Sequence, residues 1–184
     1  MGMSIADHLI YALLWLSFGA GHSLLAGATM KRIFGPGTYR LAYNAAAMVH
    51  LAVILMAGRL WLAGDSVAFD RSVWLVVAQW GLLAIGVAVL AIALRGESLG
   101  DDNEPLRIDG LHRYIRHPLY AGMFPVLWGL ADNEFSLATA VWATLYFWIG
   151  SRFEECRLVA RYGDAYRVYR RRVPAFVPWK GRAA

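Results

Sequence analysis

The chain has 184 residues, 59% of them hydrophobic, and its mean hydropathy is +0.44. Apolar residues make up about half of a typical soluble domain, so this composition excludes an ordinary soluble fold and predicts a membrane protein. The formal net charge of +5 does not predict nucleic-acid binding, because the basic residues flank apolar segments and suit anionic lipid headgroups. The single cysteine, Cys156, excludes an internal disulfide and a metal site made of cysteines alone.

Apolar segments long enough to cross a membrane follow one another along the chain. A spanning helix needs about 20 mostly apolar residues, and three uncharged segments of about this length occur before residue 95. The first is preceded by Asp7 and by no Lys or Arg. We therefore expect a membrane helix there rather than a signal peptide.

The apolar region 118–150 is interrupted near its middle by Asp132, Asn133 and Glu134. A single helix would place two acids at mid-membrane, where each is costly. We therefore predict two short helices joined by a tight polar turn. The fold prediction is one all-α domain over residues 1–184, an integral membrane helical bundle with five transmembrane helices at about 9–28, 41–58, 73–94, 118–131 and 135–150.

The distribution of Lys and Arg predicts the orientation of these spans. Of the 18 basic residues, all but Arg59 and Arg71 lie in three segments that five spans would place on one face. Cytoplasmic loops carry the excess of basic residues. The N-terminus is therefore expected outside and the C-terminus in the cytoplasm, in a prokaryotic inner membrane. The three basic segments are the loop 29–40, the loop 95–117 and the tail 151–184.

The tail is expected to form an amphipathic helix at the cytoplasmic membrane surface. Leu158, Tyr162, Tyr166 and Tyr169 recur at roughly helical spacing, with arginines between them. Such a helix directs arginines to headgroups and tyrosines to the water boundary. We interpret the tyrosines as packing residues, and Gly163 as a place where the preceding helix ends or bends.

Arg116-His117-Pro118 joins the polar loop 95–117 to the fourth span. Pro118 suits the first turn of a helix, because its missing N–H would be unpaired there anyway. The beginning of a helix favours an anionic group, so Arg116 and His117 are candidates to hold a carboxylate or a phosphate. The alternative is that the loop is only a flexible linker.

Two adjacent carboxylates, Glu154 and Glu155, stand where the last span returns to water. Neighbouring side chains on a helix point about 100° apart, so the two do not share one environment. One is expected to pair with an arginine and the other to face a cavity. The alternative is an ordinary solvated helix end.

Taken in order, these motifs resemble the C-terminal signature of the isoprenylcysteine carboxyl methyltransferases and the phospholipid methyltransferase-like proteins. The resemblance covers about residues 95–178, and its order and spacing are more specific than any one motif. It is carried by Gly110, Arg116-His117-Pro118-x-Tyr120-x-Gly122, Glu154-Glu155-x-x-Leu158, Tyr162-Gly163, Tyr166, Tyr169 and Pro174-x-Phe176-x-Pro178. The N-terminal half is similar to the NnrU family and the membrane methanethiol S-methyltransferases through Gly21-His22-Ser23-Leu24, Lys31 and Tyr39-Arg40.

The resemblance implies a methyltransferase that uses S-adenosylmethionine (SAM), bound on the cytoplasmic side. His112 departs from the family pattern, which commonly has tyrosine or phenylalanine there. Either the adenine contact differs in this chain, or His112 serves in acid–base chemistry. Carried over by position, the resemblance implies cofactor contacts from Gly110, Leu111, His112, Arg116, His117, Tyr120, Gly122 and Glu155.

The methyl acceptor is expected to be small or lipid-like and hydrophobic, with a thiol or carboxylate favoured, and to arrive from within the membrane. Methyl transfer from a sulfonium is an in-line displacement that depends on alignment. The candidate catalytic residues are Glu154 and Glu155 beside the donor and the arginines Arg152 and Arg116, which would orient an anionic acceptor.

Two histidines lie within the first two spans, and histidine inside a membrane helix often marks function. His22 is a candidate for the substrate cavity. Equally, His22 and His50 could each bond a neighbouring helix. Neither has the nearby carboxylates or cysteines of a good metal site, so no metal is predicted.

Two other functions fit part of the pattern. Membrane sterol reductases, which use NADPH, share a similar Arg-His-Pro-x-Tyr ending, although this chain is short for that group. The second alternative is a non-catalytic membrane component, which the NnrU resemblance permits. Binding of SAM, of NADPH or of neither would distinguish the methyltransferase, the reductase and the non-catalytic hypotheses.

Overall fold

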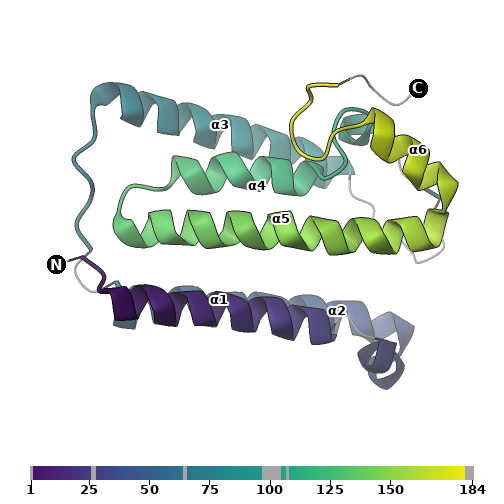
Figure 1. Ribbon diagram of the computed structural model, residues 1–184, viewed down its shortest axis with the longest axis horizontal. Helices are drawn as coiled ribbons and strands as arrows, with labels where there is room; N and C mark the ends of the chain where they lie inside the picture. Colours follow the sequence, from purple (N-terminus) through teal and green to yellow (C-terminus); the bar gives the residue numbers. More distant parts are fainter. Residues whose placement is uncertain (1, 26–27, 64–65, 97–104, 107, 181–184) are drawn as a thin grey trace. The chain divides into compact units, whose positions relative to one another are not determined.

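The computed structural model describes residues 2–25, 28–63, 66–96, 105–106 and 108–180 (Figure 1). Over these residues the chain is helical, with an isolated backbone bridge between Ala68 and Asn133. The all-α prediction is confirmed for this part of the chain. Of the predicted cytoplasmic segments, residues 97–104, 107 and 181–184 lie outside the described residues.

Two compact units make up the chain: Met1–Phe69 with Asp132–Tyr146, and Asp70–Ala131 with Phe147–Ala184. We call them unit 1 and unit 2. Helix α5 begins in the first and ends in the second. The elements are α1 (Ile5–Leu25), α2 (Ala28–Ala57), the π-helix η1 (Gly58–Leu62), α3 (Val73–Gly96), the 3-10 helix η2 (Gly110–Arg113), α4 (Pro118–Gly129), α5 (Glu134–Tyr162) and α6 (Asp164–Arg172).

Unit 1 is held together by aromatic packing between α1, η1 and the beginning of α5. Tyr11 is fully buried. Its ring centroid lies 5.4 Å from that of Phe135, and its hydroxyl shares a 2.8 Å hydrogen bond with the hydroxyl of Thr139. Gly58 permits this approach, because a Cβ there would lie 2.6 Å from the Phe135 ring and 2.7 Å from the Tyr11 ring.

A polar turn fixes the start of α5. Ser136 Oγ accepts hydrogen bonds from the N–H groups of Asp132 and Asn133, and Asn133 Oδ1 accepts one from the Ser136 N–H, each at 2.9 Å. Side chains thus satisfy amides that a helix start leaves unpaired. The Glu134 carboxylate accepts a further bond, from the N–H of Met3 at 2.6 Å. The predicted tight polar turn between two helices is confirmed.

In unit 2, α3 and α4 pack closely through glycines. A Cβ on Gly86 would lie 2.7 Å from the backbone oxygen of Gly122, and a Cβ on Gly122 would lie 2.8 Å from the Leu90 side chain. Small residues permit such close approach between membrane helices. The buried side-chain amide of Gln79 on α3 also donates a 2.7 Å hydrogen bond to the carbonyl of Ala131, which follows α4.

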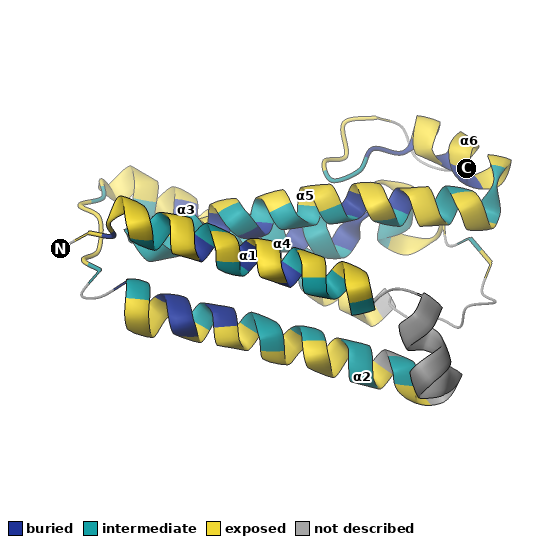
Figure 2. Cartoon of the chain, turned by 60° about the horizontal axis from the view of Figure 1, so that its bottom comes forward, coloured by how far each residue is buried: buried dark blue, intermediate teal, exposed yellow. Residues whose placement is uncertain are grey.

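Three helical stretches are long and apolar enough to cross a membrane: Ile5–Leu25, Leu41–Leu62 and Val73–Arg95. Their surfaces are largely exposed (Figure 2), and the side chains there include large apolar ones such as Trp74. Extended apolar surfaces of this kind mark contact with lipid. The chain is therefore a membrane protein, while crossing of the membrane by α4 and α5 stays a prediction.

Helix α2 begins at Ala28, so the predicted loop 29–40 is wrong in its local structure. Lys31, Arg32 and Arg40 end the apolar segment, but Lys and Arg are good helix formers in water. Charge therefore marked the limit of the span and not of the helix. The prediction for Gly163 is confirmed: α5 runs to Tyr162, and Gly163 follows with a φ of 57°.

Candidate active site

The Arg-His-Pro segment lies against the tail of the chain in unit 2. His117 is the residue that precedes α4, and Pro118 occupies the first turn, as the sequence predicts. The N–H of Arg116 donates to the carbonyl of Pro174 at 2.9 Å, and the N–H of His117 donates to the carbonyl of Ala175 at 3.0 Å. Two segments far apart in the sequence thus build one structure.

Glu155 is the buried centre of an ion cluster. Arg116 donates to its Oε1 from Nε at 2.8 Å and from Nη2 at 2.5 Å, and Nε2 of His117 lies 3.2 Å from the same oxygen. Nη1 of Arg170 lies 3.7 Å from Oε2. The side chains of Glu155 and Arg116 are only 5% and 9% exposed, so salt in the solvent screens their attraction little.

The guanidinium of Arg116 also binds the tail. Nη1 donates to the carbonyls of Arg170, at 3.2 Å, and of Val173. One planar group therefore connects a carboxylate of α5 with the backbone that follows α6. A lysine ammonium could not reproduce this fork of donors.

These partners determine the ionisation of Glu155. Burial raises the pKa of this carboxyl, but hydrogen bonds from His117 and Arg116, together with their positive charges, outweigh burial and lower the pKa to about 2. Glu155 is therefore ionised at neutral pH, and its charge is already compensated inside the protein. The prediction that one of the two adjacent glutamates pairs with an arginine is confirmed for Glu155.

Glu154 has a different environment. Its Oε2 accepts a 3.0 Å hydrogen bond from the Tyr120 hydroxyl and lies 3.6 Å from Nδ1 of His117. Its side chain is 37% exposed, against 5% for Glu155. Glu154 thus keeps a carboxylate that another molecule can reach.

Five aromatic side chains form a closed series of contacts that includes the partners of Glu154. The ring of His117 lies nearly parallel to that of Tyr120 with centroids 5.5 Å apart, and Tyr120 lies 5.1 Å from Phe147. Phe124 is 6.1 Å from Phe147 and 5.1 Å from Phe176, which returns to His117 at 5.7 Å. Faces of aromatic rings attract cations, so the series suits a positively charged group.

The tyrosines of α6 pack and do not point to chemistry. Tyr166 and Tyr169 form a buried cluster with Val173, against which Leu158 packs. Burial raises the pKa of Tyr169 to about 12 and also raises that of Tyr166, so both stay neutral. The Tyr169 hydroxyl donates a 2.7 Å hydrogen bond to the carbonyl of His112, which anchors η2 to α6.

Gly110 begins η2 with a φ of 51°, a conformation that favours glycine. Among the residues that the structure describes, none has an atom within 4 Å of where a Cβ would stand at this position. Leu111 and His112 follow on η2 and are half-buried. The carbonyls of Leu111 and His112 are engaged in hydrogen bonds, so the space that the described residues leave beside this turn is at Gly110.

Two further predicted residues lie outside the ion cluster. Gly122 is buried against Leu90 of α3, which gives it a role in helix packing. Arg152 is exposed, and its guanidinium lies over the ring of Trp148, 5.4 Å from the centroid. Arg152 can therefore meet lipid or a ligand at the surface.

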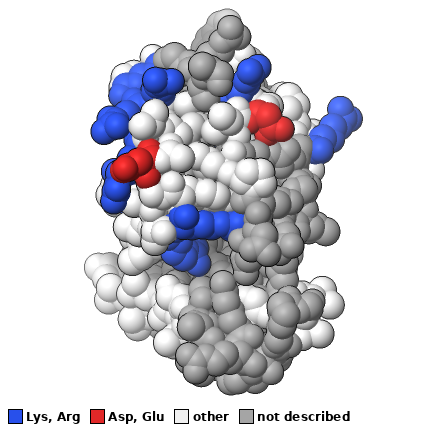
Figure 3. All heavy atoms as spheres, turned by 90° about the vertical axis from the view of Figure 1, so that its right-hand side faces the viewer, with Lys and Arg blue, Asp and Glu red and all other residues white. Residues whose placement is uncertain are grey.

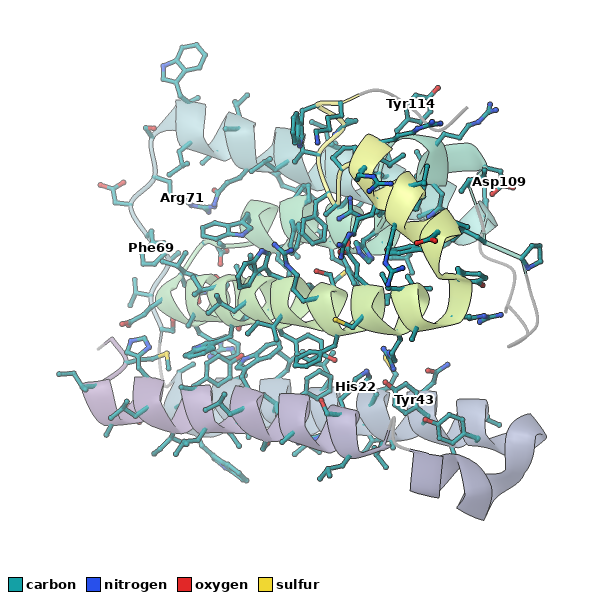
Figure 4. The ribbon with its side chains drawn as sticks, turned by 45° about the vertical axis from the view of Figure 1, so that its right-hand side comes forward. His22, Tyr43, Phe69, Arg71, Asp109 and Tyr114 are labelled. Carbon is teal, nitrogen blue, oxygen red and sulfur yellow. The ribbon has the colours of Figure 1, made fainter. Side chains whose placement is uncertain are left out.

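Unit 1 contains a second polar group, formed by His22 of α1 and Tyr43 of α2 (Figure 4). The Tyr43 hydroxyl hydrogen-bonds to Nε2 of His22, and the ring of His22 lies 5.7 Å from Phe18 and 5.9 Å from Tyr146. A polar pair thus lies among aromatic rings. His22 thus bonds a neighbouring helix, as one alternative predicts, and its place in a substrate cavity stays a prediction.

His50 of α2 bonds a neighbouring helix, as one alternative predicts. Its Nε2 lies 3.2 Å from Oγ of Ser17 on α1. Among the residues that the structure describes, no group of three or more His, Cys, Asp or Glu side chains is arranged to hold a metal ion.

Sequence reasoning missed three residues of this site: Phe147 and Phe124 of the aromatic series and Arg170, which lies beside Glu155. Phe147 precedes Glu154 by seven positions and so shares its face of α5; this spacing could have revealed it. Phe124 and Arg170 carry no signal of their own, because an aromatic residue in a span and an arginine in a basic tail are both ordinary.

Comparison with known proteins finds methyltransferases. The chain is 29% identical over 187 residues to a methanethiol S-methyltransferase of Mycobacterium tuberculosis, covering 90% of this chain and 75% of that protein. It is 27% identical over 191 residues to the methanethiol S-methyltransferase of Pseudomonas deceptionensis, covering 92% and 72%. It is also 35% identical over 77 residues to the protein-S-isoprenylcysteine O-methyltransferase of Schizosaccharomyces pombe, covering 38% of this chain and 31% of that protein.

These homologues confirm the resemblance to the isoprenylcysteine carboxyl methyltransferase-like membrane methyltransferases. No family model matches the chain. No solved structure matches it significantly.

Proposed function

Because its homologues are S- and O-methyltransferases, we propose that this chain transfers a methyl group from SAM to a small or lipid-like hydrophobic acceptor. The observation that carries the proposal is the unequal pair Glu154 and Glu155. Glu155 is compensated by Arg116, whereas Glu154 keeps a reachable carboxylate beside the aromatic series. A reachable carboxylate beside aromatic rings suits a cationic donor, because both attract positive charge.

The two glutamates are proposed to have separate roles. Glu154 faces the sulfonium or amino group of the donor, because opposite charges attract strongly where water is partly excluded. Glu155 is a positioning residue, since it holds Arg116 and His117 and through them the tail. Tyr120, which donates to Glu154, orients that carboxylate.

The remaining cofactor contacts are proposed for η2 and the segment before α4. No residue in the described part of the chain fills the space beside the Gly110 backbone, and Leu111 and His112 follow on the same turn. The buried face of Gly122 makes a packing role the better proposal there.

The proposed reaction changes charge in a way that these residues can support. SAM supplies a methyl group on positively charged sulfur, which keeps the electron pair of the broken bond when the acceptor forms its bond to the methyl carbon. A thiol acceptor must also lose its proton, and the Glu154 carboxylate is the group proposed to take it as the sulfonium charge disappears. A carboxylate acceptor is already ionised, so for that acceptor Glu154 would have no proton to take.

We further propose that the acceptor enters from the bilayer and that Arg152, exposed on α5, orients it if it is anionic. Arg116 is better suited to positioning, because its donors are engaged by Glu155 and the tail. Within unit 1, the His22–Tyr43 pair is the proposed polar contact of an acceptor cavity.

The proposed topology is five spans, with the N-terminus outside and α6 at the cytoplasmic surface of a prokaryotic inner membrane. It rests on the Lys and Arg asymmetry and on the two helices α4 and α5 joined at the polar turn. Reporter fusions after Ser66 and after Lys180 should report opposite sides of the membrane. The same side for both would overturn the topology.

Calorimetric titration of the purified protein with SAM and with NADPH tests the function. SAM should bind the wild-type protein, and Glu154→Gln should weaken binding. Glu134→Gln serves as a matched control, because Glu134 is a carboxylate at the other end of α5. Binding of NADPH alone would favour the reductase alternative, and binding of neither would favour a non-catalytic component.

A turnover assay with labelled SAM then identifies the acceptor. Candidates are small thiols, prenylcysteine analogues, fatty acids and phosphatidylethanolamine. Transfer only to the amine lipid would refute the choice of thiol or carboxylate. Transfer only to a polar, water-soluble acceptor would refute entry from the bilayer.

A further inference from the structure

We propose that the outer face of α6 and the end of the tail form a docking surface for anionic phospholipid headgroups. We call this surface the basic face. The occupant is the anionic membrane itself, recognised by charge and by an apolar anchor. The basic face consists of Arg167, Arg171, Arg172 and Lys180, with the exposed apolar residues Val168, Val177 and Trp179.

The segment 151–180 carries the entire charge excess of the chain. Its basic residues exceed its acidic ones by five, which equals the formal net charge of +5 for all 184 residues. The rest of the sequence is balanced. The charged residues of the segment are Arg152, Arg157, Arg161, Arg167, Arg170, Arg171, Arg172 and Lys180 against Glu154, Glu155 and Asp164.

The acidic residues of this segment do little to neutralise the surface. Glu155 is buried and paired with Arg116, and Glu154 accepts from Tyr120. Only Asp164 is fully exposed, where it pairs with Arg167 at 2.8 Å. Figure 3, which views the side of Figure 1 where α6 lies, shows basic side chains at the surface with few acidic ones among them.

Packing fixes which face of α6 is turned outward. Tyr166 and Tyr169 are 1% and 6% exposed and pack on Val173. The arginines at positions 167, 171 and 172 therefore remain exposed. Because a rigid element presents these charges, they form a fixed surface instead of a freely moving tail.

The end of the tail supplies the apolar part of the surface. Val177 and Trp179 are 64% and 70% exposed, and the Lys180 ammonium lies over the Trp179 ring, 4.7 Å from its centroid. Tryptophan beside a basic residue is a typical anchor at a membrane interface. A free anion or an acidic protein would be recognised by the charges alone and would not require the exposed Val177 and Trp179 beside them.

Docking would also bear on the candidate active site, because the backbone of the tail holds Arg116 and His117. The carbonyls of Pro174 and Ala175 accept their N–H groups. Lipid contacts on either side of these carbonyls, from α6 and from Trp179, would restrain them. This consequence rests on the proposed function, whereas the docking itself does not.

The test uses the full chain in lipid nanodiscs with a fluorophore on the tail. In a Cys156→Ser background, Val177→Cys is labelled, and quenching is compared in two phosphatidylcholine–phosphatidylglycerol mixtures of equal composition. In one mixture only the anionic lipid is brominated, and in the other only the zwitterionic lipid. Stronger quenching by the brominated anionic lipid is expected. Equal quenching by the two would overturn the proposal.

Two matched variants sharpen the test. Arg167→Gln/Arg171→Gln/Arg172→Gln should abolish the preference for the anionic lipid, whereas the corresponding triple change to Lys should keep it. High salt should weaken it, since surface charges are screened. A glutamine variant that retains the full preference would overturn the proposal. Inorganic phosphate that displaced the tail from the anionic lipid at equal phosphate concentration would also overturn it, in favour of a soluble anion.

SAM binding, measured separately by calorimetry, distinguishes the two proposals. A lipid preference without SAM binding would leave the docking surface intact and refute the proposed function. SAM binding without any lipid preference would support the proposed function and refute the docking surface.

Discussion

The ion cluster of unit 2 and the His22–Tyr43 pair of unit 1 place polar side chains in an apolar protein in different ways. In unit 2 full charges are kept: Glu155 is buried and ionised, and Arg116 compensates it. In unit 1 two side chains share a hydrogen bond among aromatic rings. Replacing Arg116 in unit 2 would therefore leave the charge of Glu155 buried without compensation. Replacing Tyr43 in unit 1 would only remove a hydrogen bond.

The largest expected effect is therefore on Arg116. Arg116→Ala leaves Glu155 charged, buried and without its main partner, and breaking a buried pair in this way costs about 3–5 kcal/mol. Thermal unfolding in detergent, followed by tryptophan fluorescence, should show a large fall in Tm. Arg152→Ala is the control, because the exposed Arg152 should change stability by less than about 0.5 kcal/mol. Equal effects of the two variants would remove the contrast on which the comparison rests.

Acid should weaken unit 2 through the same residue. The pKa of Glu155 is lowered from 4.5 to about 2 in the folded protein, so its stabilisation is present above the unfolded value. That stabilisation is lost as the pH falls through the folded value, and by linkage it is worth about 3 kcal/mol. Unfolding measured at neutral pH and near pH 3 should show a steeper loss for the wild-type protein than for Glu155→Gln. If the wild-type protein and Glu155→Gln lost the same amount of stability, a group other than Glu155 would cause the acid sensitivity.

A smaller effect is expected at Glu154, and it should appear in binding. Glu154→Gln removes a half-exposed charge, so the Tm should hardly change. The Kd for SAM should rise about tenfold, which corresponds to about 1.4 kcal/mol. Calorimetry on Glu154→Gln and Glu155→Gln in parallel separates a cofactor contact from a positioning residue. A large fall in Tm with unchanged affinity for Glu154→Gln would reverse the two assignments.

The smallest effect is expected in unit 1. Tyr43→Phe removes the hydrogen bond to His22 and keeps the ring, so the cost is about 1 kcal/mol. Because no ion pair is involved, the loss should not depend on salt concentration. Unfolding at low and high salt checks this. A strongly salt-dependent loss would show that the pair carries a charge, and the contrast between the units would fail.

Much of the fold follows from the apolar pattern. The segment predicted at 73–94 is α3, Val73–Gly96, because a long uncharged run can satisfy its backbone in lipid only as a helix. The turn at Asp132–Glu134 could also be predicted from the sequence, because two acidic side chains in the middle of a membrane helix would be costly. The helix over 28–40 could not, because charge limits a span in lipid without ending a helix in water.

The candidate site was readable only in part. Arg116, His117 and the two glutamates stand out because a histidine and two adjacent carboxylates accompany the arginines that normally flank membrane spans. The environment of each of these residues is set by tertiary contacts. For Arg116 these include the carbonyls of Val173 and Pro174 in the tail. Every residue has a backbone carbonyl, so no pattern of side chains predicts which carbonyl will accept a hydrogen bond. The role of the tail in binding Arg116 and His117 could therefore not be derived from the sequence.

The pairing of Arg116 and His117 with the tail has a consequence for biosynthesis. The carbonyls that these residues need lie after α6, behind the whole of α5. During translation, the residues of α3 and α4 are complete while those acceptors have not yet been made. The Arg-His-Pro segment can therefore take its final form only when the ribosome has released the residues up to Ala175. A nascent chain that stalled within α5 would lack both carbonyls, and the N–H groups of Arg116 and His117 would have no tail to donate to.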